Sequence, residues 1–375
     1  MIDRPRVLLL IPYLGGGGAE KVFALLAQNL SRQKYELHLG LITQATVPAN
    51  PFPPGITIHA LGASRIRFAV FCLAGLVRRL KPRIILSGMF HLNFLVLLLR
   101  PFLPRPVRIL IRQNGTVSSA LAFGNTPGYN RLLYRLLYRY ADKVICQSSA
   151  MASDLVHELP VEPGRLAILP NPIDVYAIHL AMEQGLSQWA GAGPHLLAVG
   201  RLSREKGFDL LLEALHSVRQ CFPTADLTIA GAGPEEADLK SLCHHLELES
   251  AVRFAGLTAE PAALFRGASV FVLSSRQEGM PNALLEAAAG GLPIVALPAS
   301  GGIADLLRGQ PGAWLANDIS SAALAACLLQ ALNALRPGER FAHSFIDPFR
   351  IDRAILGYEE LIDAALDGAV REGPQ

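Results

Sequence analysis

The sequence is poor in charged and aromatic residues, and none of its cysteines forms a CxxC pair. Charged residues make up 17% of the 375 residues and aromatic residues 7%, whereas hydrophobic residues make up 51%. So much apolar side-chain surface predicts well-packed cores and gives little reason to expect disorder. The chain is too long for one ordinary core, so the length favours two domains.

Signals for disulfides, metals and secretion are also missing. The five cysteines are odd in number and scattered, namely Cys72, Cys146, Cys221, Cys243 and Cys327. They predict reduced thiols in a cytoplasmic protein. Adjacent residues of a helix point in different directions, so Cys243-His244-His245 is not expected to bind a metal. There is no DxD motif. We therefore predict no metal and no cofactor.

Two apolar stretches need an explanation other than membrane insertion. The short apolar run after Arg6 leads into a glycine-rich turn with no small-residue cleavage site, so it predicts a first strand and not a signal peptide. The run from Ile84 to Leu99 is shorter than a membrane span and contains His91 and Asn93. A buried strand followed by a buried helix is the better interpretation.

Basic residues are unevenly distributed although the net charge is only +3. The first half of the chain holds Arg65, Arg67, Arg78, Arg79, Lys81, Arg83, Arg100, Arg105, Arg108, Arg112, Arg131, Arg135 and Arg139. This asymmetry predicts a surface that meets an anionic partner. No nucleic-acid-binding signature accompanies it, so nucleic acid is not the expected partner.

Short apolar runs alternate with helical patterns along the chain, which predicts an α/β fold with parallel sheets. The strand pattern stops after Pro170-Asn171-Pro172 and resumes at His195. We therefore predict two doubly wound, Rossmann-like domains that face a central cleft. Their expected limits are 1–172 and 194–345, with a linker at 173–193 and a last helix, about 346–375, that returns to the first domain.

A run of four glycines, Gly15 to Gly18, follows the first predicted strand and precedes a predicted helix. Glycines let the backbone approach a ligand closely, and the start of a helix offers N–H groups to an anion. The run is neither a GxGxxG fingerprint nor a P-loop. A plain turn is the alternative.

Two loops of the second domain also follow predicted strands. The loop from Gly200 to Gly207 carries Arg201 and Lys206 at a strand's carboxyl end, where open α/β sheets bind ligands. A guanidinium and an ammonium there suit a diphosphate and would stabilise its charge as it leaves. The next loop, Gly231-Ala232-Gly233-Pro234, leaves room for a base or a ribose. A solvated basic loop and a plain turn are the alternatives.

The segment from Glu278 to Glu286 gives the strongest signal. Pro281 is expected to begin a helix, so that Glu278 lies in the preceding loop and Glu286 lies inside the helix. The amides of Asn282 to Leu284 are expected to be unpaired and to bind an anion. Two carboxylates beside such a site suit a ligand with hydroxyl groups, as a sugar and a ribose provide. Two surface glutamates by chance are the alternative.

These segments, in this order, resemble the retaining glycosyltransferases of the large bacterial group-1 family (family 4), which have the GT-B architecture. The resemblance is clearest from Leu197 to Pro298, and the segment from Pro170 to Asp174 is similar to the family's PNGVD-like segment. It implies retaining transfer from a nucleotide-diphosphate sugar, UDP- or GDP-linked, to a glycan or lipid-linked glycan. The implied process is the synthesis of cell-surface polysaccharide such as lipopolysaccharide.

The resemblance also implies roles for individual residues. Arg201 and Lys206 would bind the donor diphosphate and Glu278 the transferred sugar, and these three are the catalytic candidates. Glu286 would hold the ribose hydroxyls. Further donor contacts are implied for Gly16, Gly17, Gly18, Gly200, Gly231, Gly233, Gly279, Met280, Pro281, Asn282, Ala283 and Leu284. The implied mechanism is front-face transfer, in which the leaving diphosphate helps to deprotonate the acceptor.

One position departs from the family pattern. Asn114 stands where many members have a histidine that contacts the donor sugar. His91, after another predicted strand, is a second candidate for a sugar or acceptor contact, with a satisfied buried histidine as the alternative. The departure at Asn114 keeps open a second interpretation, namely a non-catalytic GT-B scaffold or sugar-binding subunit.

A predicted helix from Tyr129 to Tyr140 suggests a contact with lipid. It places Arg131, Arg135 and Arg139 along one face, flanked by Tyr134 and Tyr138, with the leucines 132, 133, 136 and 137 on the other side. Such a basic and aromatic face suits anionic headgroups, with a solvated face over a core as the alternative. The hypothesis is a peripheral contact with the anionic inner membrane.

Overall fold

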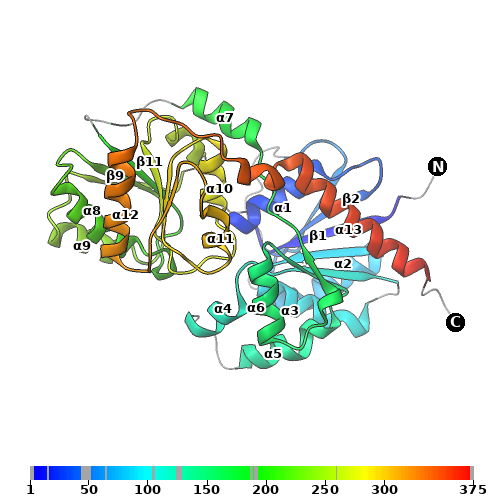
Figure 1. Cartoon of the computed structure of the whole chain (residues 1–375). Helices are drawn as coiled ribbons and strands as arrows, with labels where there is room; N and C mark the ends of the chain where they lie inside the picture. Colours follow the sequence, from blue (N-terminus) through cyan, green and yellow to red (C-terminus); the bar gives the residue numbers. More distant parts are fainter. Residues whose placement is uncertain are drawn as a thin grey trace. The chain divides into compact units, whose positions relative to one another are not determined.

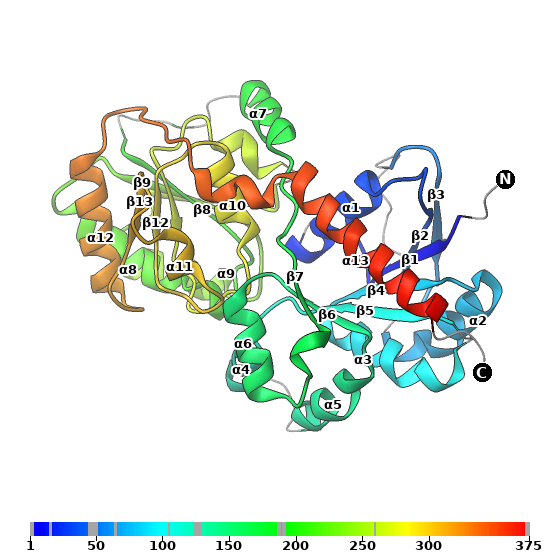
Figure 2. The same ribbon diagram turned by 45° about the vertical axis from the view of Figure 1, so that its right-hand side comes forward.

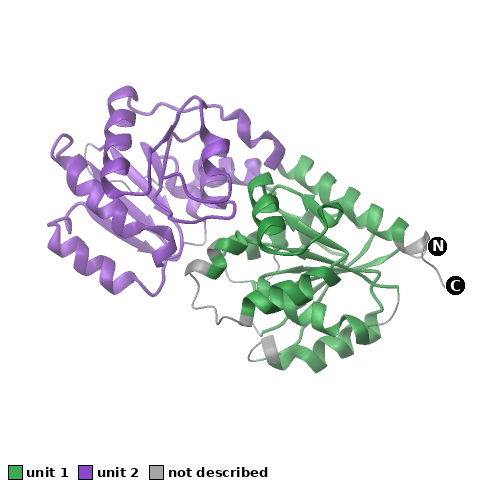
Figure 3. Cartoon of the chain, turned by 60° about the horizontal axis from the view of Figure 1, so that its bottom comes forward, with its two compact units in different colours: residues 1–172, 351–375 green, residues 173–350 purple. Residues whose placement is uncertain are grey.

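The computed structural model describes residues 4–14, 17–43, 52–63, 66–103, 106–123, 129–185, 189, 193–258 and 260–371. The chain divides into two compact units (Figure 3). Unit 1 comprises residues 1–172 and 351–375, and unit 2 comprises residues 173–350. In both units helices cover a parallel sheet, so the predicted α/β class is confirmed.

The sheet of unit 1 has seven strands in the order β3-β2-β1-β4-β5-β6-β7. The strands are β1 (Arg6–Ile11), β2 (Glu36–Leu41), β3 (Ile56–Ala60), β4 (Ile84–Gly88), β5 (Arg108–Arg112), β6 (Lys143–Cys146) and β7 (Leu166–Ile168). In the central strands β1 and β4 the apolar side chains on both faces are buried. That is the pattern of a parallel sheet covered on both sides.

Two helical layers cover this sheet (Figure 1, Figure 2). One layer consists of α1 (Gly18–Asn29) and α13 (Ile351–Arg371), whose Tyr358 is fully buried. The other layer contains α2 (Val70–Leu80), α3 (Phe90–Leu99), α4 (Val117–Phe123), α5 (Tyr129–Leu137) and α6 (Ser149–Glu158). Short 3-10 turns extend it, namely η1 (Ile66–Ala69), η2 (Arg100–Phe102), η3 (Tyr138–Tyr140) and η4 (Pro163–Arg165).

The predicted orientation of α5 is wrong. Tyr134 and Tyr138 are buried, 1% and 0% exposed, whereas Leu132 and Leu136 are exposed. The tyrosines turn inwards because they pack on the ring of Phe94, with ring centroids 4.9 and 6.1 Å away. The exposed side of the helix therefore combines arginine with leucine and not with tyrosine.

The sheet of unit 2 has six strands in the order β10-β9-β8-β11-β12-β13. The strands are β8 (His195–Val199), β9 (Asp226–Ala230), β10 (Val252–Gly256), β11 (Val270–Leu273), β12 (Ile294–Ala296) and β13 (Ala313–Leu315). On one face lie α8 (Phe208–Arg219), α9 (Glu236–His245) and α12 (Ser321–Ala334). On the other lie α7 (Val175–Gln184), η6 (Pro261–Leu264), α10 (Asn282–Ala289), α11 (Ile303–Leu307) and η7 (Ser344–Phe349).

The boundary region differs from the prediction of a linker at 173–193. Its first half forms α7, which begins after Asp174 and is capped by a bond from the Ala177 N–H to the Asp174 carboxylate, 2.9 Å long. Ile178 and Ala181 of this helix are buried against η6 and α10, so the segment belongs to the core of unit 2. The last helix of the chain, α13, belongs to unit 1.

Within the described residues, no helix combines the length and the hydropathy that a membrane span needs.

Candidate functional site

The loop after β8 is fixed against the loop after β11. Its 3-10 turn η5 (Arg204–Lys206) ends at Gly207, which has a positive φ of 62°. A Cβ at Gly207 would collide with the carbonyl oxygen of Ser274, so only glycine fits this turn. The Ser274 hydroxyl in turn donates to the Lys206 carbonyl oxygen at 2.8 Å. The backbone of Lys206 is thereby held at the carboxyl end of the sheet.

Lys206 and Glu278 form an ion pair between these two loops. The Lys206 Nζ lies 2.6 Å from Glu278 Oε1, and the Ser275 hydroxyl donates to the same oxygen at 2.6 Å. The Glu278 side chain is 7% exposed and the Lys206 side chain 24%. The two hydrogen bonds to this carboxylate, one of them from a cation, offset part of the cost of burying it.

A second ion pair fixes the same loops from the other side. Arg276 donates to both carboxylate oxygens of Asp209, at 2.7 and 2.6 Å, and to the Arg204 carbonyl oxygen at 3.0 Å. Burial raises the pKa of Asp209, but the bonds from Arg276 outweigh it and hold the pKa below its usual value. This bidentate contact joins the loop after β11 to the start of α8, and the bond to Arg204 joins it to the loop that carries Lys206.

The segment that follows Glu278 is held by Ser300. The Ser300 hydroxyl accepts the Glu278 N–H at 3.3 Å and donates to the Glu278 carbonyl oxygen at 3.1 Å. Helix α10 then begins at Asn282, with Pro281 as its N-cap and not its first residue. Glu286 lies inside this helix and is buried, so Glu278 and Glu286 lie on either side of the helix start, as predicted.

The predicted row of unpaired amides at the start of α10 needs a correction. The amide of Leu284 donates to the Pro281 carbonyl oxygen at 3.1 Å, and that of Leu285 donates to it at 3.2 Å. The first turn of the helix contains an i to i+3 hydrogen bond, so the backbone hydrogen bonds begin one residue earlier than in a regular α-helix. The prediction is therefore wrong for Leu284.

The glycines of the loop after β9 have a packing role that needs no ligand. A Cβ at Gly231 would collide with the Gly200 carbonyl oxygen, and one at Gly233 with that of Leu202. Gly231 has a φ of 152°, and its amide donates to the Gly256 carbonyl oxygen at 2.8 Å. The loops after β8 and β9 therefore lie directly against each other. Arg201, in the first of these loops, is exposed.

In unit 1, Asn114 is held by a buried arginine that the sequence did not single out. Arg112, the last residue of β5, is 2% exposed and donates to the side-chain oxygens of Asn114 and Asn171. With its oxygen bound to Arg112, the Asn114 amide turns its NH2 group the other way. Burial raises the pKa of Tyr358 on α13, and the charge of Arg112 opposes that rise. A basic residue at the end of a buried strand was the available sequence signal.

The other predicted residues of unit 1 have different surroundings. His91 lies in the first turn of α3, exposed, and its ring centroid is 3.6 Å from that of Phe90. Partial desolvation lowers its pKa.

Gly17 is the N-cap of α1 and Gly18 its first residue, whereas Gly16 lies outside the described residues. The buried carboxylate of Glu20 lies against Gly17 at the start of this helix, an unfavourable neighbour for a phosphate.

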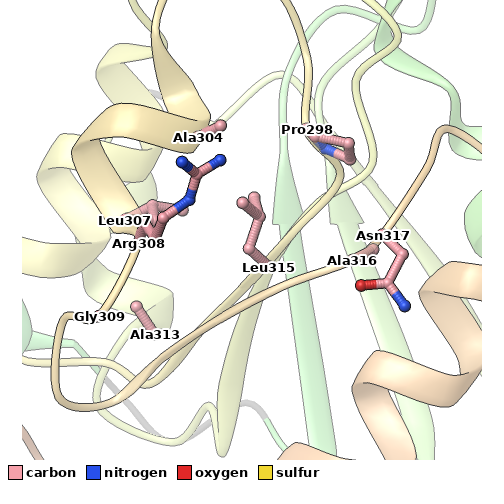
Figure 4. Close-up of a pocket in the computed structure, with 9 residues that line it drawn as sticks. All are labelled: Pro298, Ala304, Leu307, Arg308, Gly309, Ala313, Leu315, Ala316 and Asn317. Atoms are coloured by element: carbon pink, nitrogen blue, oxygen red, sulfur yellow. The ribbon is translucent and has the colours of Figure 1, made fainter.

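A separate pocket of about 350 Å³ in unit 2 contains none of the predicted site residues (Figure 4). Arg308, after α11, and Asn317 lie on opposite sides of it, with Leu315 between them. Two parallel-sheet α/β units in one chain match the GT-B class of folds.

Solved structures agree with this class. The chain is similar to HepE of Anabaena in complex with UDP, with a TM-score of 0.75 and 18% sequence identity, over 96% of this chain and 100% of that one. At this level of identity the likeness concerns the fold. The predicted GT-B fold is therefore confirmed.

Sequence comparisons give the family. Residues 193–334 match the family described as Glycosyl transferases group 1, and residues 16–176 match the one described as Glycosyltransferase Family 4. An uncharacterized glycosyltransferase of Haemophilus influenzae is 37% identical over 32% of this chain, but the alignment spans only 34% of that protein. The N-acetylgalactosamine-N,N'-diacetylbacillosaminyl-diphospho-undecaprenol 4-alpha-N-acetylgalactosaminyltransferase of Campylobacter jejuni is 28% identical over 78% of this chain and 80% of its own length.

The chain belongs to the group-1 (family 4) glycosyltransferases.

Proposed function

We propose that this chain transfers a sugar from a nucleotide-diphosphate sugar to a glycan acceptor carried on a lipid, with retention of configuration. The observation that carries the proposal is the partly buried ion pair of Lys206 and Glu278 in the loops after β8 and β11. Ligands of open α/β sheets bind at the carboxyl ends of the strands. A cation and an acid placed there together match the two halves of a nucleotide sugar, its diphosphate and its hydroxyl groups.

We assign the diphosphate to Lys206, the exposed Arg201 and the start of α10. The ammonium of Lys206 has three N–H donors and uses one of them on Glu278, so others can face the phosphate oxygens. The positive end of α10 adds to this attraction. The small residues from Gly279 to Ala283 let the phosphates approach the helix start.

Glu278 and Glu286 are assigned to hydroxyl groups. Lys206 and Ser275 both bind Oε1 of Glu278, so Oε2 is the oxygen assigned to the transferred sugar. Glu286, buried within α10, is assigned to the ribose of the donor. In unit 1, the NH2 group of Asn114 is assigned to the sugar in place of the usual histidine, and His91 is a second contact for sugar or acceptor.

The proposed chemistry is a front-face displacement. The bond from the anomeric carbon to the leaving phosphate oxygen breaks as the acceptor oxygen bonds to the same face of that carbon. The acceptor proton passes to the leaving diphosphate, whose charge Lys206 and Arg201 stabilise. We assign no metal or other cofactor to this reaction, so a chelator should leave the rate unchanged.

The lipid-linked acceptor is inferred from the Campylobacter relative, whose name places its acceptor on diphospho-undecaprenol. That alignment covers most of both chains, 78% of this one and 80% of the relative. Such an acceptor fits a peripheral enzyme of the cytoplasmic membrane surface that builds cell-surface polysaccharide, lipopolysaccharide included.

One observation favours a second candidate, a GT-B scaffold without activity, because Asn114 replaces the histidine of many members. Calorimetry with UDP and with GDP, followed by donor hydrolysis over a panel of nucleotide sugars, separates the two. The proposed enzyme binds one diphosphate and hydrolyses or transfers from at least one donor. Binding of neither nucleotide contradicts the proposal, and binding without turnover of any donor supports the scaffold.

A further inference from the structure

Most of one helical layer of unit 1 is made from a segment without acidic residues, and only α6 and η4 of that layer lie outside this segment. Between Glu36 and Asp142 the sequence contains no aspartate or glutamate, but it holds twelve arginines and one lysine. This segment includes α2, α3 and α5 together with the turns η1, η2 and η3. Any charge that these elements present to solvent is therefore positive.

These elements form one continuous part of the layer. Helix α3 contacts α2, α5, η1, η2 and η3. Figures 1 and 2 both show α2, α3 and α5 on the side of the sheet away from α1 and α13. Side chains on the outer surface of this layer therefore belong to a single face of unit 1, called here the basic apolar face.

Large apolar side chains project from this face. Phe71 on α2 is 86% exposed and Phe102 in η2 is 66% exposed. Phe68, Leu98, Leu132 and Leu136 are exposed on the same layer. Among the described residues, every phenylalanine with an exposed side chain lies here. Scattered exposed apolar residues are ordinary on a protein surface, but a cluster of this kind marks a binding surface.

Arginines stand beside these apolar side chains. On α2, Phe71 and Arg78 are seven residues apart, two helical turns, so they share one side of the helix, and both are exposed. On α5 and η3, Arg131, Arg135 and Arg139 recur every four residues next to Leu132 and Leu136. The guanidinium of Arg139 also lies 4.9 Å over the ring of Tyr140. Arg131 is partly neutralised by Glu158, at 3.4 Å.

We propose that the basic apolar face docks on an anionic lipid bilayer. Its phenylalanines and leucines enter the boundary between headgroups and acyl chains, while its arginines bind the lipid phosphates. A nucleic acid would match the charge but not the aliphatic side chains of Leu98, Leu132 and Leu136, which do not stack on bases. A bilayer matches both the positive charge and the aliphatic side chains. The inference rests on the proposed function, since a lipid-linked acceptor requires the enzyme to reach a membrane.

The first experiment is flotation of the full chain with vesicles of phosphatidylglycerol and phosphatidylethanolamine, compared with vesicles of phosphatidylcholine. We expect binding to the anionic vesicles that weakens as salt is added. Phe71→Ser and Arg135→Glu should each reduce the bound fraction per lipid by about tenfold. Their matched controls on unit 2, Tyr176→Ser and Arg336→Glu, alter exposed residues of the same type and should leave binding unchanged.

The second experiment places a probe on the face itself. Cys72 on α2 and Cys221 in unit 2 are both exposed. An environment-sensitive dye on Cys72, in a Cys221→Ser background, should shift to the blue with anionic vesicles. The same dye on Cys221, in a Cys72→Ser background, should not shift.

Three results of these two experiments overturn the inference. They are equal binding to neutral vesicles, equal losses in the control variants, and flotation without a shift at Cys72. Binding to RNA in place of vesicles also overturns it. Calorimetry with UDP and GDP keeps this inference separate from the proposed function. Nucleotide binding without vesicle binding rejects only the membrane surface, whereas vesicle binding without nucleotide binding rejects only the transferase.

Discussion

Lys206 and Glu278, 72 residues apart in the sequence, share a hydrogen bond of 2.6 Å at the carboxyl ends of two adjacent strands. The family pattern assigns them to opposite halves of the donor, yet they touch each other, and Ser275 binds the same carboxylate oxygen. The pairing holds the ammonium and the carboxylate in place before any ligand arrives. Preorganised charges of this kind stabilise a developing negative charge without reorganisation in the reaction.

We expect replacement of Lys206 and replacement of Glu278 to affect nucleotide binding and sugar transfer to different degrees. Lys206→Met should weaken UDP or GDP binding and reduce transfer by about 10²- to 10³-fold, because a charge on the leaving diphosphate loses its partner. Glu278→Gln should reduce transfer to a similar degree with a smaller effect on binding of the free diphosphate. Calorimetry and transfer rates measure the two effects, and circular dichroism checks folding.

Lys240→Met is the matched control for this prediction. Lys240 forms an exposed pair with Glu236 at 2.7 Å in the same unit, so its loss should leave nucleotide binding and transfer unchanged. Full transfer activity in Lys206→Met or in Glu278→Gln would remove the replaced residue from the site.

Arg112 is expected to act through Asn114. Arg112→Lys keeps the positive charge but cannot bind Asn114 and Asn171 with a planar fork, so the Asn114 amide should lose its fixed orientation. We expect kcat to fall about tenfold with little change in donor KM, as for an interaction made in the transition state. Asn114→Ala should give a similar fall, and Asn114→His should retain more activity than Asn114→Ala.

A double variant tests the link between the two residues. If Arg112 acts by positioning Asn114, then Arg112→Lys combined with Asn114→Ala should be no slower than Asn114→Ala alone. Additive losses would show that Arg112 acts elsewhere. Thermal unfolding of each variant shows whether lost packing accounts for the effect.

The sequence allowed much of the fold to be predicted, because buried strands and amphipathic helices leave regular apolar patterns. The first strand, expected in the apolar run after Arg6, is observed as β1, and the strand pattern resumes at His195 with β8, as expected. The segment from Glu278 to Glu286 was also correctly placed around a helix start, since Pro281 and the small residues after it determine that geometry.

Other features depend on partners distant in sequence. The inward turn of Tyr138 is possible because its hydroxyl donates to Gln113 at 2.6 Å, a contact no helical pattern reveals. Likewise, the burial of Arg112 depends on Asn171, 59 residues later. The linker prediction failed over α7 because the helix is short and its buried residues, Ile178 and Ala181, find their partners in η6.

Asp142 should contribute to stability in a pH-dependent manner. Burial raises the pKa of this carboxyl, but the bonds from Arg100 and from the Ile109 N–H, together with the Arg108 charge, outweigh it and lower the pKa below its usual value. Because the folded pKa is below the unfolded one, the contribution is complete above the unfolded pKa of about 4 and is lost as the pH falls through the folded pKa.

Asp142→Asn should therefore lower the free energy of unfolding by about 2 kcal/mol at neutral pH, and the difference from the unchanged protein should shrink below about pH 4. Urea unfolding at several pH values measures this. Glu162→Gln, which breaks an exposed pair with Arg165, should have little effect at any pH. A difference between Asp142→Asn and the unchanged protein that does not vary with pH contradicts the assignment.

The cysteines should fall into two reactivity classes. Cys72 and Cys221 are exposed, whereas Cys146, Cys243 and Cys327 are buried. Burial raises the pKa of the Cys146 thiol to about 12 and that of Cys327 to about 11, so few thiolates form at neutral pH. Since the thiolate is the reactive species, Ellman's reagent should titrate Cys72 and Cys221 rapidly in the folded protein and all five cysteines in denaturant.

The same titration connects the thiols to the basic apolar face. Anionic vesicles should slow the reaction of Cys72, which lies beside Phe71 on α2, and leave the rate of Cys221 unchanged. Single variants Cys72→Ser and Cys221→Ser assign each fast phase. Rapid reaction of a third thiol in the folded protein would contradict the packing around the buried cysteines, because a side chain within a close-packed core reacts only when that core opens.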